Sequence, residues 1–290
     1  MTPSRRRWPR GVAPVLVLAA TSLSLPAHPA TAQDDSLWPD REEIERFLKK
    51  AEITQRQEIG TGVTKPERLT LERDEIVRQA CFKRIDVKQQ DSWRSEIAAY
   101  ELDKLLGLGM VPPTVQRTVG GRKGCLQLWV TGTTMEAFEG TLPDLEGWRD
   151  QVSVMWLFDD LIANCDRHLN NALVSPEGRL ILIDNSKTFR CDEYLRNDLN
   201  ARGTGTHARF WGVAFDESRE RYPTRYPPKL IERLRGVTDK EIKKAIKRYV
   251  WGWRALLVVT RRELILERVD SMGAGALRGD SSLALFSLPE

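Results

Sequence analysis

The chain has 290 residues, and its 45 basic residues against 41 acidic residues give a formal net charge of +4. Four arginines lie within residues 1–32, where there is no acidic residue, so beyond residue 32 the two signs balance. That balance argues against a nucleic-acid-binding protein, which would carry a basic patch in its folded part. The remaining length suits one large domain or two lobes around a cleft, with enough chain for a sizeable core.

The N-terminus is predicted to be a signal peptide over residues 1–32. Arg5, Arg6, Arg7 and Arg10 form a basic start, residues 12–25 are apolar, and Ala30-Thr31-Ala32 offers a small-residue cleavage site before Gln33. We therefore expect an exported protein, periplasmic or extracellular, by a Sec or twin-arginine route. The apolar run is short and interrupted by proline, so no stable membrane span is expected in the mature chain; an uncleaved anchor is the alternative.

Residues 33–57 are predicted to form an N-terminal extension that is helical from Glu42 to Ala51. A helix is predicted from Ser92 to Leu106, because its apolar residues recur at helical spacing and Gly107 follows. Short apolar runs separated by polar turns predict an antiparallel sheet with strands at 59–63, 69–71, 80–83, 116–119 and 125–130.

After Gly132 the pattern becomes helical. A long helix is predicted over 145–165, and a hairpin pairs 173–174 with 180–183 around Pro176-Glu177-Gly178. Residues 191–227 are irregular, and the chain closes with a loose tail from Ser271. Further helices are predicted at 228–235, 239–253 and 256–269. Sheet first and helices later indicate the α+β class.

The stretch Asp166-Arg167-His168-Leu169-Asn170-Asn171, followed by the apolar run Leu180–Ile183 and Asp184, carries the chemistry. Phosphoryl transfer needs a carboxylate to orient the attacking hydroxyl, and an amide oxygen and a second carboxylate to hold Mg²⁺ on ATP. A carboxylate at the end of a buried strand also needs a partner, and Mg²⁺ would be one. Taken singly, Asp166 would be a turn residue and Asp184 a strand-end cap.

The segment from Asp166 to Asp184 resembles the phosphatidylinositol 3-/4-kinase-like superfamily of atypical kinases, and is also similar to HipA-like and secreted Golgi-type kinases. The resemblance implies a bilobal protein-kinase-like fold, with a small antiparallel-sheet N-lobe at 58–132 and a mostly helical C-lobe at 133–270. It implies ATP and Mg²⁺ (or Mn²⁺) as cofactors. Asp184 is followed by Asn185-Ser186 where protein kinases have Phe-Gly.

The resemblance also assigns roles in that segment. Asp166 would position the hydroxyl and accept its proton, and Asn171 and Asp184 would bind the metal. His168 would help to move the proton, which suits an imidazole of near-neutral intrinsic pKa; a structural histidine is the alternative. Arg167 is expected to form a buried ion pair, and Asn170 to be local structure.

Lys83 and Glu96 form a second candidate pair. Kinases pair a strand lysine with a helix glutamate so that the lysine can hold the α- and β-phosphates. Lys83 ends a predicted strand and Glu96 opens the next helix. Lys88 and Glu101 compete for these roles, and the alternative is a surface lysine with a glutamate at a helix N-terminus.

Two backbone segments complete the nucleotide site that the resemblance implies. Gly60 and Gly62 would cover the phosphates, although the full Gly-x-Gly-x-x-Gly pattern is absent from the sequence. Trp129 and Val130 would face adenine at the hinge between lobes. Two glycines in a tight turn and a core tryptophan are the alternatives.

The cysteines are Cys81, Cys125, Cys165 and Cys191, an even number that permits two disulfides in an exported protein. The implied kinase-like fold favours Cys165–Cys191 beside the cleft and leaves Cys81–Cys125 on neighbouring strands, while four free thiols are the alternative. With no C-x-x-C pair and three histidines in the chain, a structural zinc site is not expected.

The sequence thus predicts an exported ATP- and Mg²⁺-dependent kinase-like phosphotransferase that moves the γ-phosphate to a hydroxyl acceptor on a protein, lipid or sugar. Two alternatives stay open. One is a nucleotide-binding pseudokinase that acts as an interaction module, since ATP is scarce outside the bacterial cytoplasm. The other is a metal-dependent hydrolase, which would usually have more His or carboxylate ligands.

Overall fold

A five-stranded antiparallel sheet forms the first half of the described chain. The computed structural model describes residues 37–60, 66–85, 92–138, 145–164, 166–189, 226–273 and 277. The sheet order is β1-β2-β3-β5-β4, from β1 (Glu52–Glu58), β2 (Glu67–Arg73), β3 (Ile76–Lys83), β4 (Thr114–Val119) and β5 (Arg122–Leu128). The central strand β3 pairs with β2 and β5, so its last residue, Lys83, lies inside the sheet.

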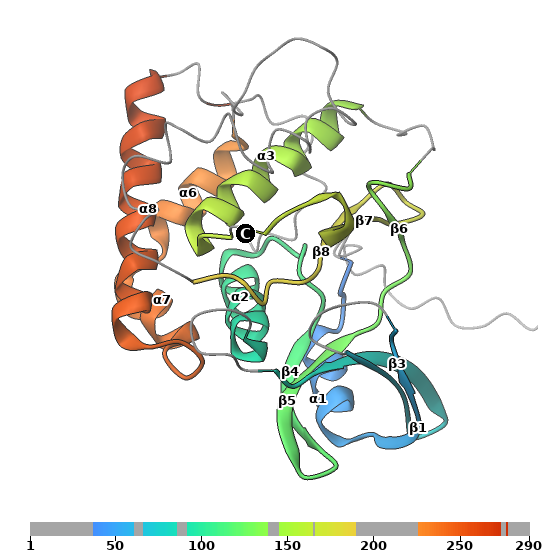
Figure 1. Cartoon of the computed structure of the whole chain (residues 1–290). Helices are drawn as coiled ribbons and strands as arrows, with labels where there is room; N and C mark the ends of the chain where they lie inside the picture. Colours follow the sequence, from blue (N-terminus) through green and yellow to red (C-terminus); the bar gives the residue numbers. More distant parts are fainter. Residues whose placement is uncertain are drawn as a thin grey trace, which may run out of the picture. The chain divides into compact units, whose positions relative to one another are not determined.

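Two helices accompany the sheet. α1 (Arg41–Lys50) packs on it through Ile44, Phe47 and Leu48. α2 (Trp93–Leu106) contacts β4 and β5 and also the later helix α7, and Figure 1 shows it between them. The Ser92 side chain accepts the N–H of Arg94 at the start of α2, and Gly107 ends the helix in the left-handed region at φ 70°. These are the cap residues that such helix ends favour.

The second half of the described chain is mostly helical, with a small sheet. The helices are α3 (Leu145–Ile162), the 3₁₀ turn η1 (Leu169–Asn171), α6 (Pro228–Gly236), α7 (Asp239–Ile246) and α8 (Gly252–Met272). The sheet order is β6-β7-β8, from β6 (Thr133–Thr134), β7 (Ala172–Val174) and β8 (Leu180–Leu182). None of the described helices has the length and apolar character needed to cross a membrane.

Two main hydrophobic clusters hold these elements. The larger one joins α2, α3 and the C-terminal helices, with residues such as Leu102, Met155 and Val258 fully buried. The other joins α1 to the five-stranded sheet and includes Leu173 and Ile181 from the hairpin β7–β8. The β7–β8 hairpin therefore packs on both clusters, and it is this hairpin that carries the segment around Asp184.

The structure confirms the α+β class and most predicted elements, but it corrects several boundaries. The first strand of the described chain is Glu52–Glu58, which pairs with β2, and α1 packs on the same sheet. Of the strand predicted at 59–63, residues 59–60 are not in a strand and 61–63 lie outside the described residues. The predicted break between the last two helices is wrong: α7 ends at Ile246 and α8 begins at Gly252. α8 also continues to Met272, past the predicted start of the tail.

Candidate functional site

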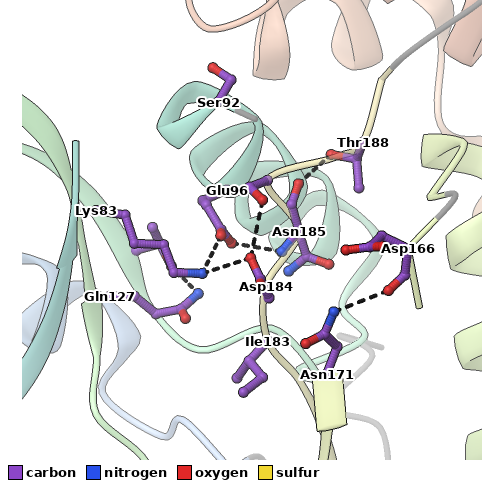
Figure 2. Close-up of polar contacts among 12 residues, drawn as sticks. Lys83, Ser92, Glu96, Gln127, Asp166, Asn171, Ile183, Asp184, Asn185 and Thr188 are labelled. Atoms are coloured by element: carbon purple, nitrogen blue, oxygen red, sulfur yellow. Dashed lines mark hydrogen bonds and ion pairs between the residues drawn. The ribbon is translucent and has the colours of Figure 1, made fainter. Parts of the chain in front are cut away.

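Lys83, Glu96 and Asp184 converge from three elements that are far apart in the sequence. Lys83 Nζ lies 2.5 Å from Glu96 Oε1 and 3.0 Å from Asp184 Oδ1. Figure 2 shows Lys83 reaching from β3 toward α2 and Asp184, with Asp166 and Asn171 on the other side of Asp184 in this view. The predicted pairing of Lys83 with Glu96 is therefore present, whereas Glu101 pairs with Lys104 and Lys88 lies outside the described residues.

The close packing at the end of β3 requires a glycine. Gly124 lies on β5 next to Cys125, which pairs in register with Lys83. A Cβ at Gly124 would lie 2.3 Å from the Lys83 carbonyl oxygen and 2.6 Å from the Phe82 ring. No real side chain tolerates such distances, so Gly124 fixes how closely β5 approaches the end of β3.

The charges of the three groups depend on one another. Burial lowers the pKa of Lys83, but Glu96 and Asp184 outweigh burial and raise it well above its usual value. Burial raises the pKa of Glu96, and Lys83 opposes that rise. Burial likewise favours neutral Asp184, but Lys83 and the Ser186 hydroxyl bring its pKa down to about 2. Lys83 and Asp184 are therefore both charged at neutral pH.

Arg167 holds the loop of Asp166 in place through buried polar contacts. Its guanidinium is fully buried and makes a bidentate ion pair with Asp159 of α3, at 2.9 and 3.1 Å. The other contacts of Arg167 are the Asn171 carbonyl at 2.6 Å, the Ile183 carbonyl at 2.7 Å and Asn185 Oδ1 at 2.7 Å. One side chain thus joins α3, the 166–171 loop and the segment after β8, and the expected buried ion pair of Arg167 is confirmed.

Asn171 and Asp184 each keep one oxygen for a ligand. The Asn171 amide nitrogen donates to the Asp166 carbonyl at 3.0 Å, which orients the side chain and leaves Oδ1 without a partner among the described residues. Both hydrogen bonds to the Asp184 carboxylate, from Lys83 and Ser186, end on Oδ1, which leaves Oδ2. Asp184 adopts φ 53°, a left-handed conformation that is uncommon away from glycine and recurs at functional sites.

These two oxygens fit a magnesium ion shared with phosphates. Within the described ranges, no group of three or more His, Cys, Asp or Glu side chains could hold a metal ion alone. Mg²⁺ usually binds through one or two carboxylates together with substrate phosphates and water, and not in an all-protein cage. One carboxylate oxygen and one amide oxygen are therefore a suitable donor set for a metal that arrives with a nucleotide.

His168 and Asn170 have local roles in this loop. His168 Nδ1 accepts the Asn170 N–H at 3.3 Å and caps η1. Asn170 donates its side-chain amide to Glu136, which lies next to β6. These contacts account for the orientation of His168 but do not test its role in proton transfer.

Lys187 belongs to the site and was not predicted from the sequence. Its Nζ lies 2.9 Å from Asp166 Oδ2, and both side chains are about one-third exposed. Nothing in the spacing of the motif indicates this contact, because Lys187 reaches Asp166 only through the turn at 186–187 that follows Asp184.

The backbone segments expected around the nucleotide are only partly described. Gly60 follows β1, a Cβ there would meet nothing within 4 Å, and Gly62 lies outside the described residues. The Trp129 N–H bonds to the Gln79 carbonyl of β3 at 2.9 Å, so this amide is not available to adenine. The Trp129 carbonyl and the Val130 N–H remain for that role, and the Trp129 ring stacks on Arg68 at 4.4 Å.

The disulfide expected on neighbouring strands is not formed. Cys81 and Cys125 lie on β3 and β5, but both are free cysteines, and their register partners are Gln127 and Lys83. Burial raises the pKa of the Cys81 thiol to about 11 and that of Cys125 as well, so both stay protonated and pack as small apolar groups. Cys165 and Cys191 lie outside the described residues.

No protein-family model matches this chain, and no curated protein matches it.

Proposed function

We propose that this chain is an exported, ATP- and Mg²⁺-dependent kinase-like phosphotransferase that moves the ATP γ-phosphate to a hydroxyl acceptor. The observation that carries the proposal is the ion pair of Lys83 with Glu96 at 2.5 Å, with Asp184 on the same ammonium at 3.0 Å. Protein kinases require a strand lysine paired with a helix glutamate, and a metal-binding aspartate, to be in place together.

The order of elements supports a bilobal kinase-like arrangement within this proposal. Lys83 ends the third strand, Glu96 lies on the helix that follows, and the Asp166–Asp184 segment comes after a long helix. The kinase motifs occur in that order on those types of element. The five-stranded sheet would form the smaller lobe, and α3 with the later helices the larger one.

Each residue has a role in the proposed reaction that its geometry allows. The Lys83 ammonium has three protons and uses two on Glu96 and Asp184, so the third can donate to the α- and β-phosphates. Asp184 Oδ2 and Asn171 Oδ1 would hold a magnesium ion, which would draw charge from the phosphate oxygens. Asp166 would orient the acceptor hydroxyl and take its proton. Positioning and electrostatics then supply the catalysis, without a covalent intermediate on the enzyme.

The test is phosphoryl transfer from γ-labelled ATP with Mg²⁺ or Mn²⁺, on a panel of protein, lipid and sugar acceptors. We expect transfer by the unaltered chain and its loss in Asp184→Ala. The matched control is Asp270→Ala, which removes an exposed carboxylate that pairs with Arg235 near the end of α8. Transfer that survives Asp184→Ala would reject the site, and a chain that neither binds ATP nor transfers phosphate would reject the function.

A nucleotide-binding pseudokinase is the second candidate, and one observation favours it. Lys187 occupies one oxygen of Asp166, the carboxylate that would take the hydroxyl proton, at 2.9 Å. If this pair persists when nucleotide binds, the acceptor hydroxyl has to compete with an ammonium group for Asp166, which disfavours proton transfer. ATP binding that is equal in the unaltered chain and Asp184→Ala, without transfer in either, would select this candidate.

A further inference from the structure

Both members of the ion pair between Lys187 and Asp166 are partly exposed, whereas Lys83 is largely buried in its pairs with Glu96 and Asp184. The side chains of Lys187 and Asp166 are 35% and 32% exposed, while those of Lys83 and Glu96 are 11% and 1% exposed. Exposed ion pairs contribute little to stability, about 0–1 kcal/mol, whereas a buried pair is costly to break. Lys187 can therefore leave Asp166 at low cost.

The backbone around Lys187 is nevertheless fixed. Four hydrogen bonds hold the residues on either side of it: Ser92 N to Ser186 O at 3.1 Å, Ser95 Oγ to Thr188 O at 3.3 Å, Thr188 Oγ1 to Asn185 O at 2.7 Å and Phe189 N to Ile162 O at 2.7 Å. Lys187 thus combines a fixed Cα with a long flexible stem and a partly exposed ammonium group. Such a lysine can exchange one anion for another within the reach of its side chain.

The charges of the proposed reaction favour that exchange. Lys187 now occupies Oδ2 of Asp166, which leaves Oδ1 for the acceptor hydroxyl but keeps an ammonium group on the carboxylate that has to take the proton. A terminal phosphate placed for transfer to that hydroxyl would bring further negative charge next to Asp166. The phosphate and the Asp166 carboxylate would repel each other strongly where little water screens them. A cation between the two groups would offset that repulsion.

We propose that Lys187 is the binding group for the terminal phosphate of the nucleotide, and that it moves from Asp166 to that phosphate when ATP binds. This inference rests on the proposed function. In the transfer step the acceptor oxygen forms a bond to the γ-phosphorus, the bond to the β–γ bridging oxygen breaks with its electron pair going to ADP, and the hydroxyl proton goes to Asp166. Lys187 keeps its protons and donates hydrogen bonds to the non-bridging oxygens.

The experiment compares ADP with a non-hydrolysable ATP analogue, both with Mg²⁺, by isothermal titration calorimetry. In Lys187→Ala we expect the analogue to bind about tenfold more weakly or worse and ADP to bind within about twofold of the unaltered chain, since only the analogue has a γ-phosphate. Lys187→Arg should recover part of the analogue affinity. Lys123→Ala, an exposed lysine at the β4–β5 hairpin, is the control for loss of one positive charge.

A second variant separates the exchange from a simple charge effect. Asp166→Asn releases Lys187, so it should tighten binding of the analogue more than that of ADP, and this gain should vanish in the double variant Asp166→Asn/Lys187→Ala. If Lys187→Ala weakens both ligands equally, or changes neither, the inference is wrong while the proposed function stands. If the unaltered chain binds neither ligand, the proposed function fails and the inference fails with it.

Discussion

Glu96 accepts the backbone N–H of Asn185 at 2.9 Å, using the carboxylate oxygen that does not contact Lys83. The same carboxylate therefore fixes both the lysine of β3 and the backbone next to Asp184. Helix α2 and the segment after β8 are further joined by hydrogen bonds from Ser92 N to Ser186 O and from Ser95 Oγ to Thr188 O. Any displacement of α2 would thus disturb the Lys83 pair and the position of Asp184 together.

Removing the Glu96 carboxylate should destabilise the fold strongly. Glu96→Ala would leave the Lys83 ammonium buried with Asp184 as its remaining partner, and the Asn185 N–H without its acceptor. We expect a loss of about 3–5 kcal/mol in the free energy of unfolding, the usual cost of removing one member of a buried pair. Urea unfolding measures it. Glu96→Gln keeps an acceptor for Asn185 and should lose less.

Glu101→Gln is the matched control on the same helix. Its carboxylate is partly exposed and pairs with Lys104 at 3.1 Å one turn away, so its loss should cost no more than about 0.5 kcal/mol. Equal costs for Glu96→Ala and Glu101→Gln would show that the Lys83–Glu96 pair is not the buried support described above.

Replacing Arg167 by lysine should destabilise the fold, although the positive charge is kept. The guanidinium uses its planar fork on Asp159 and also reaches the Asn171 and Ile183 carbonyls and Asn185 Oδ1, which one ammonium group cannot do. For Arg167→Lys we expect a loss of about 2–4 kcal/mol in the free energy of unfolding, within the range for a disrupted buried network.

Urea unfolding of Arg167→Lys should be compared with that of Arg73→Lys, which changes an exposed arginine paired with the adjacent Asp74. The control should unfold within about 0.5 kcal/mol of the unaltered chain. If Arg167→Lys is as stable as this control, the hydrogen bonds around residue 167 do not depend on the planar guanidinium group.

The elements with regular apolar spacing could be predicted from the sequence, and those without it could not. α2 and α3 have buried residues at helical spacing, and the β4–β5 and β7–β8 hairpins have glycine in their turns. β1 was missed because Glu52–Glu58 is almost entirely polar and exposed, as an edge strand can be. The break at 247–251 was misplaced because no glycine or proline marks it before Gly252.

The candidate site was predictable where its residues lie in one motif. Asp166, Asn171 and Asp184 are close in sequence, and their spacing indicated them. Element type and order indicate Lys83 and Glu96, but only the fold shows that they are in contact. The Lys187–Asp166 contact could not be predicted, because it depends on the turn after Asp184. The polar partners of Arg167 likewise become neighbours only through tertiary packing.

A methyl group at Gly124 should disturb the end of β3. In Gly124→Ala the new Cβ would contact the Lys83 carbonyl oxygen at 2.3 Å, and a backbone atom in a central strand cannot move away cheaply. We expect a loss of about 1–3 kcal/mol in the free energy of unfolding, the usual cost of overpacking, and weaker nucleotide binding because Lys83 would shift.

Gly60→Ala is the control, because nothing lies within 4 Å of a Cβ there and its φ is not in the left-handed region. Its unfolding free energy should change by no more than about 1 kcal/mol, and a small gain is expected where the backbone permits alanine. Should Gly124→Ala prove as harmless as Gly60→Ala, β5 must lie farther from β3 than these distances state.

Because of Asp103, we expect the free energy of unfolding to fall as the pH rises from about 4 to about 6. Its carboxylate is fully buried on α2, and it accepts the N–H groups of Gly109, Met110 and Val111 at 2.8–3.2 Å, with Arg41 at 3.5 Å. Burial outweighs Arg41 and these amides and raises the pKa from 3.8 to about 6. The native state therefore holds a proton in this range that the unfolded chain has already lost.

Because the native state binds more protons, ionising Asp103 should cost about 2–3 kcal/mol between pH 4 and pH 6. The measurement is the free energy of unfolding in urea at several pH values for the unaltered chain and for Asp103→Asn. The unaltered chain should lose stability relative to the variant as the pH rises through this window. Asp270→Asn, which changes an exposed carboxylate, should run parallel to the unaltered chain. A gain in stability relative to Asp103→Asn over the same window would mean that the three amides and Arg41 lower the pKa of Asp103 instead.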